Sequence, residues 1–356
     1  MLLTENGKIV PRQPIKDTSF WGRDDFGPKN DWKVALPPNV IADIEAALPG
    51  LKKASLHPKD IRPEHFPLPN SAVFLEEVNK LIEIGPGFAL LTGFPIKNLG
   101  TADASLAYQG FMSHFGRIAI QNRIGEYVVE VSDKGRGLGP QARGHYGNAE
   151  LNFHADGANA VSLLCLETAP EGGQSLLIGA AAVYNTILTE RPDILPILER
   201  GFHHHRRDER EENDPKVTPW RTPVFAYYDD RLHLIYTRIS IDYCEAEGIE
   251  ITPEEKDALD FLDNVLGRPH LQVSMDLAPG DLQIVNNFLC LHARTSYRDS
   301  ETQKRRLIRL WLDNEKSLRN GPGKMDWYMP EHSRFLRERR ALLEFPLNSK
   351  QSERKK

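Results

Sequence analysis

The chain has 356 residues, of which 40% are hydrophobic and 27% charged, so it is a globular protein with room for a sizeable core. A formal net charge of −5 gives no electrostatic reason to expect nucleic acid or an anionic membrane as a partner. Three widely spaced cysteines without a CxxC pair argue against a disulfide framework and a zinc–thiolate site, and a reducing cytoplasmic compartment is the expectation.

The first part of the chain predicts an irregular start followed by helices. Residues 1–35 are polar and are expected to lie on the surface; they carry no signal-peptide pattern, and no apolar run reaches the ~18 residues that span a bilayer. A buried strand is predicted to end at Gly93. Helical spacing of apolar residues predicts helices within 37–50 (ending at Gly50), 69–87 (capped by Asn70 or Ser71) and 103–116.

From about residue 126 the pattern changes to short strands separated by turn residues, which is typical of a sandwich or barrel. A helix is predicted at 181–201, and a second at 252–267, where Thr252 and Glu255 form a capping box. We therefore predict one domain at 70–347, a surface extension at 1–69 and a disordered charged tail at 348–356. The predicted strands are 127–131, 160–168, 175–179, 224–228, 231–240, 271–277, 281–292 and 305–312.

Two potential metal ligands stand two positions apart in the stretch LNFHADGANAVSLLCL, which covers residues 151–166. Alternate residues of a strand face the same side, so His154 and Asp156 would point together, with Ala155 turned away. An imidazole and a carboxylate on one face suit a divalent first-row metal. Because a single HxD pair also arises by chance, the interpretation depends on a third ligand.

His292 is the best third ligand, because it ends the strand-like run DLQIVNNFLCLH and would be held rigidly. Two histidines and one carboxylate leave three coordination positions open, a set diagnostic of non-haem Fe(II) oxygenases. The competing cluster FHHHRRDERE at 202–211 lies in a dense run of charges and is interpreted as solvated surface. A closed zinc site would usually recruit cysteines, and none is nearby.

A strand rich in arginine, KRRLIRLWL, follows His292. Arg305 and Arg309 share one face of this otherwise apolar strand, where burial without an anionic partner would be costly. Guanidinium offers a carboxylate two parallel hydrogen bonds. An iron site that activates oxygen needs electrons, and a dicarboxylic keto acid whose far carboxylate meets an arginine would supply them. The plain alternative is an edge strand whose arginines pair with surface acids.

These blocks resemble, in order along residues 70–315, the Fe(II)/2-oxoglutarate-dependent oxygenases of the taurine dioxygenase/TfdA-like group, also called clavaminate-synthase-like. The segments that carry the resemblance are GFALLTGFP, FMSHFGRI, ELNFHADGA, APEGGQSLLIG, GDLQIVNNFLCLHARTSY and RRLIRLWL. The resemblance implies a mainly β fold with flanking helices, a double-stranded β-helix (jelly roll). It also implies a dioxygenase that uses Fe(II), 2-oxoglutarate and O2 and releases succinate and CO2.

The resemblance further implies roles for individual residues. His154, Asp156 and His292 would hold iron, and Ser175 and Arg305 would hold the far carboxylate of 2-oxoglutarate. Arg306, which would face the other way, is the second choice for the anchoring arginine. Arg309 is expected near the cosubstrate or an anionic substrate. Halogenation usually requires loss of the carboxylate ligand, so Asp156 argues against it.

The substrate is expected to be a small metabolite, with several arginines favouring one that carries a carboxylate, and the family also oxidises sulfonates, betaines and intermediates of secondary metabolism. Hydroxylation, desaturation and oxidative cyclisation remain alternatives, as does a homo-oligomer. Two other classes stay open: a non-catalytic jelly-roll sensor of a small acid, and a cupin-type metal enzyme without 2-oxoglutarate. Candidate substrate contacts are Tyr146, Asn148, Glu150 and, on the face it would share with Tyr236, Arg238.

Overall fold

The computed structural model describes residues 2–3, 9–10, 12–16, 18–26, 32–135, 146–207, 210, 213, 215–228, 231–314 and 317. Its strands are β1 (Leu2–Leu3), β2 (Ile9–Val10), β3 (Lys33–Ala35), β4 (Phe88–Thr92), β5 (Arg117–Ala119), β6 (Val128–Val131), β7 (Leu151–His154), β8 (Ala160–Glu167), β9 (Glu171–Gly172), β10 (Ser175–Gly179), β11 (Phe225–Tyr228), β12 (Arg231–Leu234), β13 (Gln272–Met275), β14 (Leu282–Asn286), β15 (Cys290–Arg294), β16 (Tyr297–Arg298) and β17 (Arg306–Asp313). The α-helices are α1 (Pro38–Ala54), α2 (Ala72–Glu83), α3 (Ile96–Met112), α4 (Ala180–Glu190), α5 (Leu195–Arg200), α6 (Arg238–Asp242) and α7 (Pro253–Leu266).

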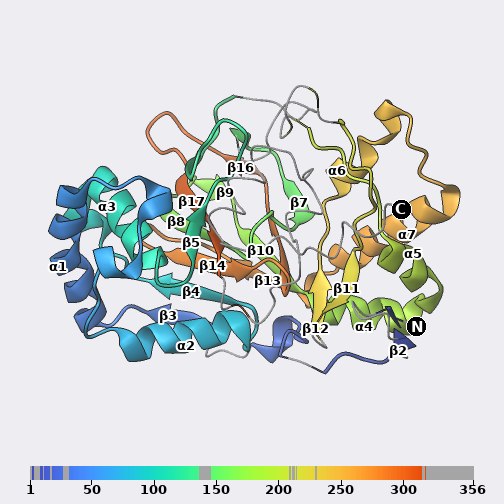
Figure 1. The fold of residues 1–356 in the computed structure, drawn as a ribbon, viewed down its shortest axis with the longest axis horizontal. Helices are drawn as coiled ribbons and strands as arrows, with labels where there is room; N and C mark the ends of the chain where they lie inside the picture. The colour runs from blue at the N-terminus through green and yellow to red at the C-terminus, as the bar shows by residue number, and fades with distance from the viewer. Residues whose placement is uncertain are drawn as a thin grey trace, which may run out of the picture.

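Two antiparallel sheets form the centre of the molecule (Figure 1). The larger sheet has the order β3-β4-β14-β8-β17-β5, with β6 also paired to β17, and only β3 runs parallel to its neighbour. The smaller sheet has the order β13-β10-β15-β7. A hydrogen bond of 3.0 Å from the Ser175 hydroxyl on β10 to the Gln283 side-chain oxygen on β14 connects the sheets, so these side chains lie between them.

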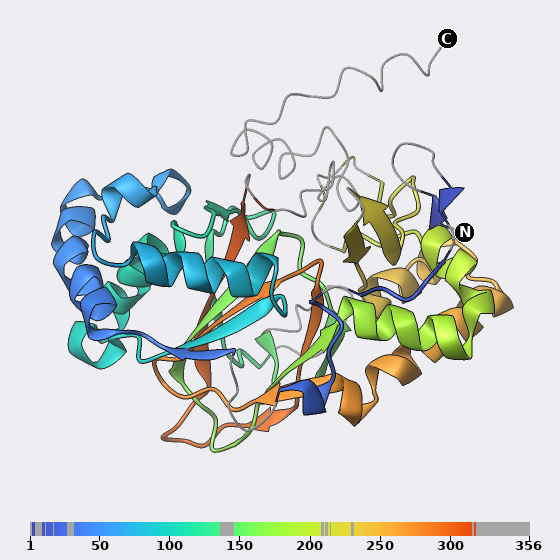
Figure 2. The same ribbon diagram turned by 90° about the horizontal axis from the view of Figure 1, so that it is seen from below.

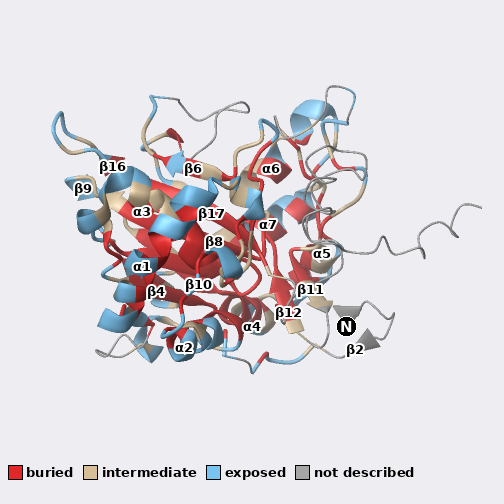
Figure 3. Cartoon of the chain, turned by 60° about the vertical axis from the view of Figure 1, so that its left-hand side comes forward, coloured by how far each residue is buried: buried red, intermediate tan, exposed pale blue. Residues whose placement is uncertain are grey.

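Helices cover the outer faces of both sheets, as seen from two directions in Figures 1 and 2. Helices α1, α2 and α3 pack on the larger sheet in one apolar cluster that includes Val40, Phe111 and Leu310. Helices α4, α5 and α7 pack on the smaller sheet in a second cluster, which includes Tyr184 and Leu291. Buried residues fill these layers in Figure 3, so the sheets are rigid platforms for the side chains between them.

Several predicted elements are confirmed, including the strand that ends before Gly93 and the helix capped by Thr252 and Glu255. Others are wrong in a consistent way, because one apolar run contains two elements. The run 281–292 is divided into β14 and β15, 181–201 into α4 and α5, and 231–240 into β12 and α6. Helix α1 continues past Gly50 to Ala54 rather than ending there.

The N-terminal part contributes to the core as well as to the surface. Trp21 and Trp32 are buried, and β3 extends the larger sheet by pairing with β4. Helix α1 packs its apolar side, including Ile44, into the same cluster. The boundary between residues 69 and 70 stays a prediction, and the predicted tail at 348–356 lies outside the described residues. Within the described part, no helix is long and apolar enough to cross a membrane.

Candidate iron and 2-oxoglutarate site

The structure brings His154, Asp156 and His292 together, and among the described residues they are the one group of three that could hold a metal ion. One ligand atom from each lies within 4.8 Å of the others. His154 ends β7 and pairs in register with His292 on the adjacent β15, so the ring centroids are 4.4 Å apart. Asp156 follows just after β7, and Ala155 between them turns into the apolar cluster below the smaller sheet, as predicted.

Each histidine presents a ring nitrogen to the site. The Nδ1 of His154 lies 2.8 Å from the carbonyl oxygen of Asn152, a contact that leaves Nε2 free as a ligand atom. Burial, assisted by the neighbouring His154, lowers the pKa of His292 to about 3. The 3.7 Å contact of His292 Nε2 with Asp156 Oδ2 therefore joins a neutral ring to a carboxylate. A neutral imidazole is the form that binds a metal.

Asp156 is kept ionised by its surroundings. The indole nitrogen of Trp311 donates a hydrogen bond of 2.9 Å to Asp156 Oδ2, and Arg309 Nη1 lies 3.4 Å from the same oxygen. Burial alone would raise the carboxyl pKa, but Arg309 and the histidines outweigh it and hold the pKa well below its usual range. Two imidazoles and one carboxylate fit Fe(II), and no cysteine belongs to the group.

Arg305 lies just before β17 and is 5% exposed. Its Nη1 is buried without a hydrogen-bond partner, and in the part of the chain that the structure describes no carboxylate forms an ion pair with it. Burial lowers its pKa from the usual value. A buried guanidinium with an unused donor is the group expected to receive an anionic ligand, which fits the far carboxylate of 2-oxoglutarate.

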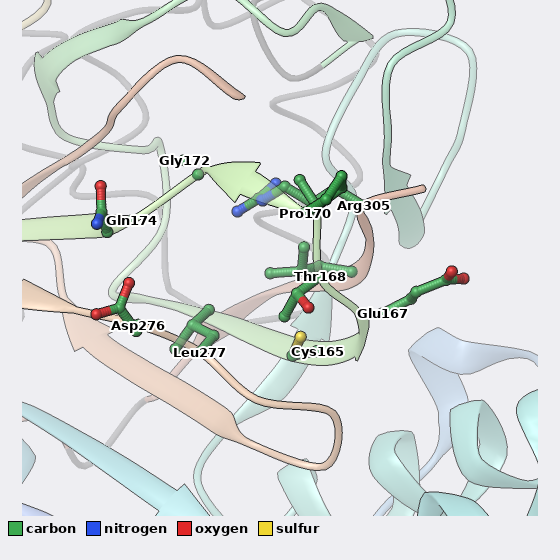
Figure 4. Close-up of a pocket in the computed structure, with 12 residues that line it drawn as sticks. Cys165, Glu167, Thr168, Pro170, Gly172, Gln174, Asp276, Leu277 and Arg305 are labelled. Atoms are coloured by element: carbon green, nitrogen blue, oxygen red, sulfur yellow. The ribbon is translucent and has the colours of Figure 1, made fainter. Parts of the chain in front are cut away.

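A cavity of about 250 Å³ lies against Arg305 and is lined by residues of the turn 167–174 and by Cys165, Asp276, Leu277 and Leu307 (Figure 4). A Cβ built on Gly173 would lie 3.0 Å from Arg305 Nε, and the φ of Gly173 is +79°. The second glycine of the GG turn therefore lets the arginine lie against the backbone. Burial raises the pKa of the Cys165 thiol to about 12.

The other predicted arginines have partners. Arg309 donates 2.8 Å from Nε to Gln121 and faces Asp156, so it supports the metal group. Arg306 is on the opposite side of the strand, where its Nη2 lies 3.3 Å from Glu130 with both side chains partly exposed. Ser175 is buried and bonded to Gln283, within the interior that also receives the metal group. The geometry thus favours Arg305 over Arg306 as the anchor.

The candidate substrate contacts differ in their surroundings. Tyr146 is buried with the Lys134 ammonium 4.4 Å from its ring centroid, whereas Asn148 and Glu150 are exposed just before β7. The strand predicted for Tyr236 and Arg238 is wrong at this point, because residues 238–242 form α6. Arg238 forms ion pairs there with Asp242, Asp260 and Asp263, so its charge is already balanced.

Sequence reasoning missed three features of this region. It did not single out Trp311 or Gln121, whose hydrogen bonds hold Asp156 and Arg309. For Trp311 the available signal was its position two residues after Arg309, which places both side chains on one face of the strand. The histidines at 203–205 were wrongly interpreted as solvated surface, because His204 is 2% exposed and the other two are partly buried. They form no metal group among the described residues.

Residues 52–311 match the model of the taurine catabolism dioxygenase TauD, TfdA family. The chain belongs to the TauD/TfdA family. An FR-33289 synthase of Streptomyces rubellomurinus is 30% identical over 86% of this chain and 92% of the relative. The taurine hydroxylase-like protein SAT17 of Stachybotrys chartarum is 27% identical over 87% of this chain and 82% of the relative.

Solved structures show the same fold. An asparagine oxygenase bound to Fe(II), hydroxyasparagine and succinate superposes with a TM-score of 0.62 at 19% identity, covering 79% of this chain and 93% of that one. The non-haem iron oxygenase OrfP with iron and α-ketoglutaric acid gives a TM-score of 0.57 at 12% identity, covering 79% and 93%. The predicted double-stranded β-helix is confirmed.

Membership of the TauD/TfdA family decides between the predicted classes. The protein is an Fe(II)- and 2-oxoglutarate-dependent dioxygenase that uses O2, and not the small-acid sensor or the cupin-type enzyme. Its substrate is a small molecule.

Proposed function

We propose that this dioxygenase hydroxylates a C–H bond of a small metabolite that carries a carboxylate, with His154, Asp156 and His292 as the iron ligands. The observation that supports the proposal most directly is the approach of one ligand atom from each of these three partly buried side chains to within 4.8 Å of the others. When bound, Fe(II) with 2-oxoglutarate and O2 supplies the oxidising power for C–H cleavage, with succinate and CO2 as coproducts.

The chain's own residues would position the reactants and exclude water. Arg305 and Ser175 are proposed to hold the far carboxylate of 2-oxoglutarate, which fixes the direction in which its keto end points. Trp311 and Arg309 orient Asp156 through its Oδ2. His292 on β15 and Arg305 just before β17 are separated in sequence only by the segment that contains the short β16. One continuous stretch of chain would therefore hold both ends of the cosubstrate.

The substrate is proposed to enter beside the segment 146–150. Tyr146, Asn148 and Glu150 precede β7 and lead directly to His154. Two structural neighbours were solved with amino acids, hydroxyasparagine and (3S)-hydroxy-L-Arg, which supports a substrate with a carboxylate and an amine. Arg238 is a weaker candidate, because three aspartates already balance its charge. The three cysteines are free and buried, which supports a cytoplasmic location.

The first experiment is anaerobic. Addition of Fe(II) and then 2-oxoglutarate to the metal-free protein should produce the weak visible absorption of the chelated ferrous ion. The Asp156→Ala variant should lose the band. A panel of amino acids, each accompanied by the matching amine that lacks the carboxylate, is then screened for substrate-dependent succinate formation under air. Iron binding without the band in the wild-type protein would contradict the proposed site, and coupling only to substrates without a carboxylate would contradict the substrate class.

A further inference from the structure

A second buried arginine, Arg294, lies on the same interior face as the proposed cosubstrate site. On β15 it stands two residues after His292, so both side chains leave the strand on one side. Arg294 is paired in register with Ser175 on β10, and directly opposite residues of antiparallel strands share a face. Ser175 in turn contacts Gln283 across the interior. Arg294 thus borders the region between the metal group and Ser175.

Arg294 and Arg305 are held together by one aromatic ring. The guanidinium carbons of Arg294 and Arg305 lie 4.7 and 5.2 Å from the centroid of the Tyr297 ring, and each arginine is 5% exposed. Two like charges buried this close repel each other, and the ring quadrupole offsets only a part of the cost. An arrangement of this kind is stable when an anion binds between or beside the two cations.

The hydrogen bonds of Arg294 leave one side of its guanidinium unused. Its Nη2 donates to the carbonyl oxygens of Gly147, at 3.1 Å, and Ala149, and its Nε donates to Thr295 at 3.3 Å. Its Nη1 is buried without a partner, as are Nη1 of Arg305 and the hydroxyl of Tyr297. Among the described residues no carboxylate forms an ion pair with either arginine.

We propose that Arg294 and Tyr297 complete the site for the far carboxylate of the cosubstrate, so that this group is bound by two arginines instead of one. The inference rests on the proposed function, in which Arg305 and Ser175 receive the same carboxylate. Arg294 has a second role, because its Nη2 fixes the backbone at residues 147 and 149. The same side chain therefore connects the cosubstrate carboxylate to the segment where the substrate is proposed to enter.

The test compares 2-oxoglutarate with 2-oxovalerate, which has the same chain length and keto acid end but a methyl group in place of the far carboxylate. Dissociation constants are measured by anaerobic calorimetry on the Fe(II)-loaded protein, without turnover. Arg294→Gln should weaken 2-oxoglutarate about tenfold or more and change 2-oxovalerate less than about twofold. Arg298→Gln, an exposed neighbour paired with Glu171, is the matched control and should change neither.

Loss of affinity for both acids to the same extent in Arg294→Gln would mean a purely structural role and would overturn the inference. Tyr297→Phe keeps the ring and removes only the unpaired hydroxyl, and we expect it to weaken 2-oxoglutarate about threefold with 2-oxovalerate unchanged. If Arg294→Gln does not fold, Tyr297→Phe decides the test: an unchanged preference of that variant for 2-oxoglutarate over 2-oxovalerate overturns the inference. Arg305→Gln distinguishes failure of this inference from failure of the proposed function. If that variant leaves the preference for 2-oxoglutarate over 2-oxovalerate unchanged, Arg305 is not the anchor of the far carboxylate.

Discussion

The two ends of the proposed cosubstrate site are balanced in opposite ways. At the metal end, the Asp156 carboxylate already has Trp311 and Arg309 within hydrogen-bonding reach, and burial lowers the pKa of His292 to about 3. At the far end, Arg294 and Arg305 are buried without an ion-pair partner in the described residues, and their Nη1 atoms have no acceptor. The protein therefore supplies a full set of contacts around the carboxylate at the metal end and, at the other end, two buried cations that no described carboxylate balances.

The largest effect is expected at the metal end. Asp156→Ala removes the only carboxylate of the group and should abolish succinate formation, because the remaining histidines are a poor set for Fe(II). It also leaves Arg309 without that carboxylate, so a lower melting temperature is expected. Succinate release and anaerobic Fe(II) binding are measured, with Asp156→Asn as the variant that keeps the Trp311 acceptor. Unchanged iron affinity in Asp156→Ala would exclude Asp156 as a ligand.

The next largest effect is expected at the far end of the proposed cosubstrate site, which contains Arg305. Arg305→Gln should raise the KM for 2-oxoglutarate about a hundredfold, since a charge-assisted pair to a buried carboxylate contributes ~1.5–3 kcal/mol and more when two bonds form. The matched change Arg306→Gln affects a partly exposed residue paired with Glu130 and should alter KM less than about twofold. The reverse order of the two variants would transfer the anchoring role to Arg306.

A smaller effect is expected from the support of Asp156. Trp311→Phe keeps an aromatic ring and removes the 2.9 Å hydrogen bond to Asp156 Oδ2. Mutation of a residue that orients a metal ligand typically lowers metal affinity by ~10–100-fold. Because Arg309 remains in place, we expect about tenfold weaker Fe(II) binding. The affinity for 2-oxoglutarate, measured at saturating iron, should stay within about twofold. A larger change in cosubstrate than in iron affinity would show that the two ends are not separately balanced.

The smallest effect concerns the turn beside Arg305. In Gly173→Ala the new methyl group would lie 3.0 Å from Arg305 Nε, and the positive φ of 79° adds backbone strain. Arg305 is expected to shift by a few tenths of an ångström, which should weaken 2-oxoglutarate about threefold to tenfold and leave Fe(II) affinity unchanged. Gly248→Ala, at a positive φ with open space around it, controls for strain alone. Equal losses of 2-oxoglutarate affinity in the two variants would mean that the close contact of Gly173 with Arg305 does not contribute to cosubstrate binding.

The sequence was most informative where a residue's chemistry limits its place. HxD before a strand, a distant histidine at the end of another, and an arginine strand after it were sufficient to predict the grouping of His154, Asp156 and His292. The capping box at Thr252 was equally clear, because its contacts are local. The long apolar runs were less informative, since burial on both sides removes the periodicity that distinguishes one strand from two.

Contacts between distant segments could not be predicted from local patterns. The support of Asp156 by Trp311, and of Arg309 by Gln121, joins residues more than a hundred positions apart. For Arg238 the strand propensity of LIYTRIS was overridden by ion pairs with Asp260 and Asp263 on α7. For the His203–His205 cluster, charge density suggested exposure, whereas the fold buries His204 beneath its neighbours.

Cys165 has a consequence for the durability of the enzyme. Its sulfur lines the cavity beside Arg305, in a protein whose chemistry consumes molecular oxygen. Sulfur is oxidised as the thiolate, and a cation nearby would normally promote that form. Burial raises the pKa of this thiol to about 12, so the thiolate is only a very small fraction at neutral pH. The protein can therefore keep a polarizable sulfur atom packed against this cavity without making the thiol the first group to be oxidised during turnover.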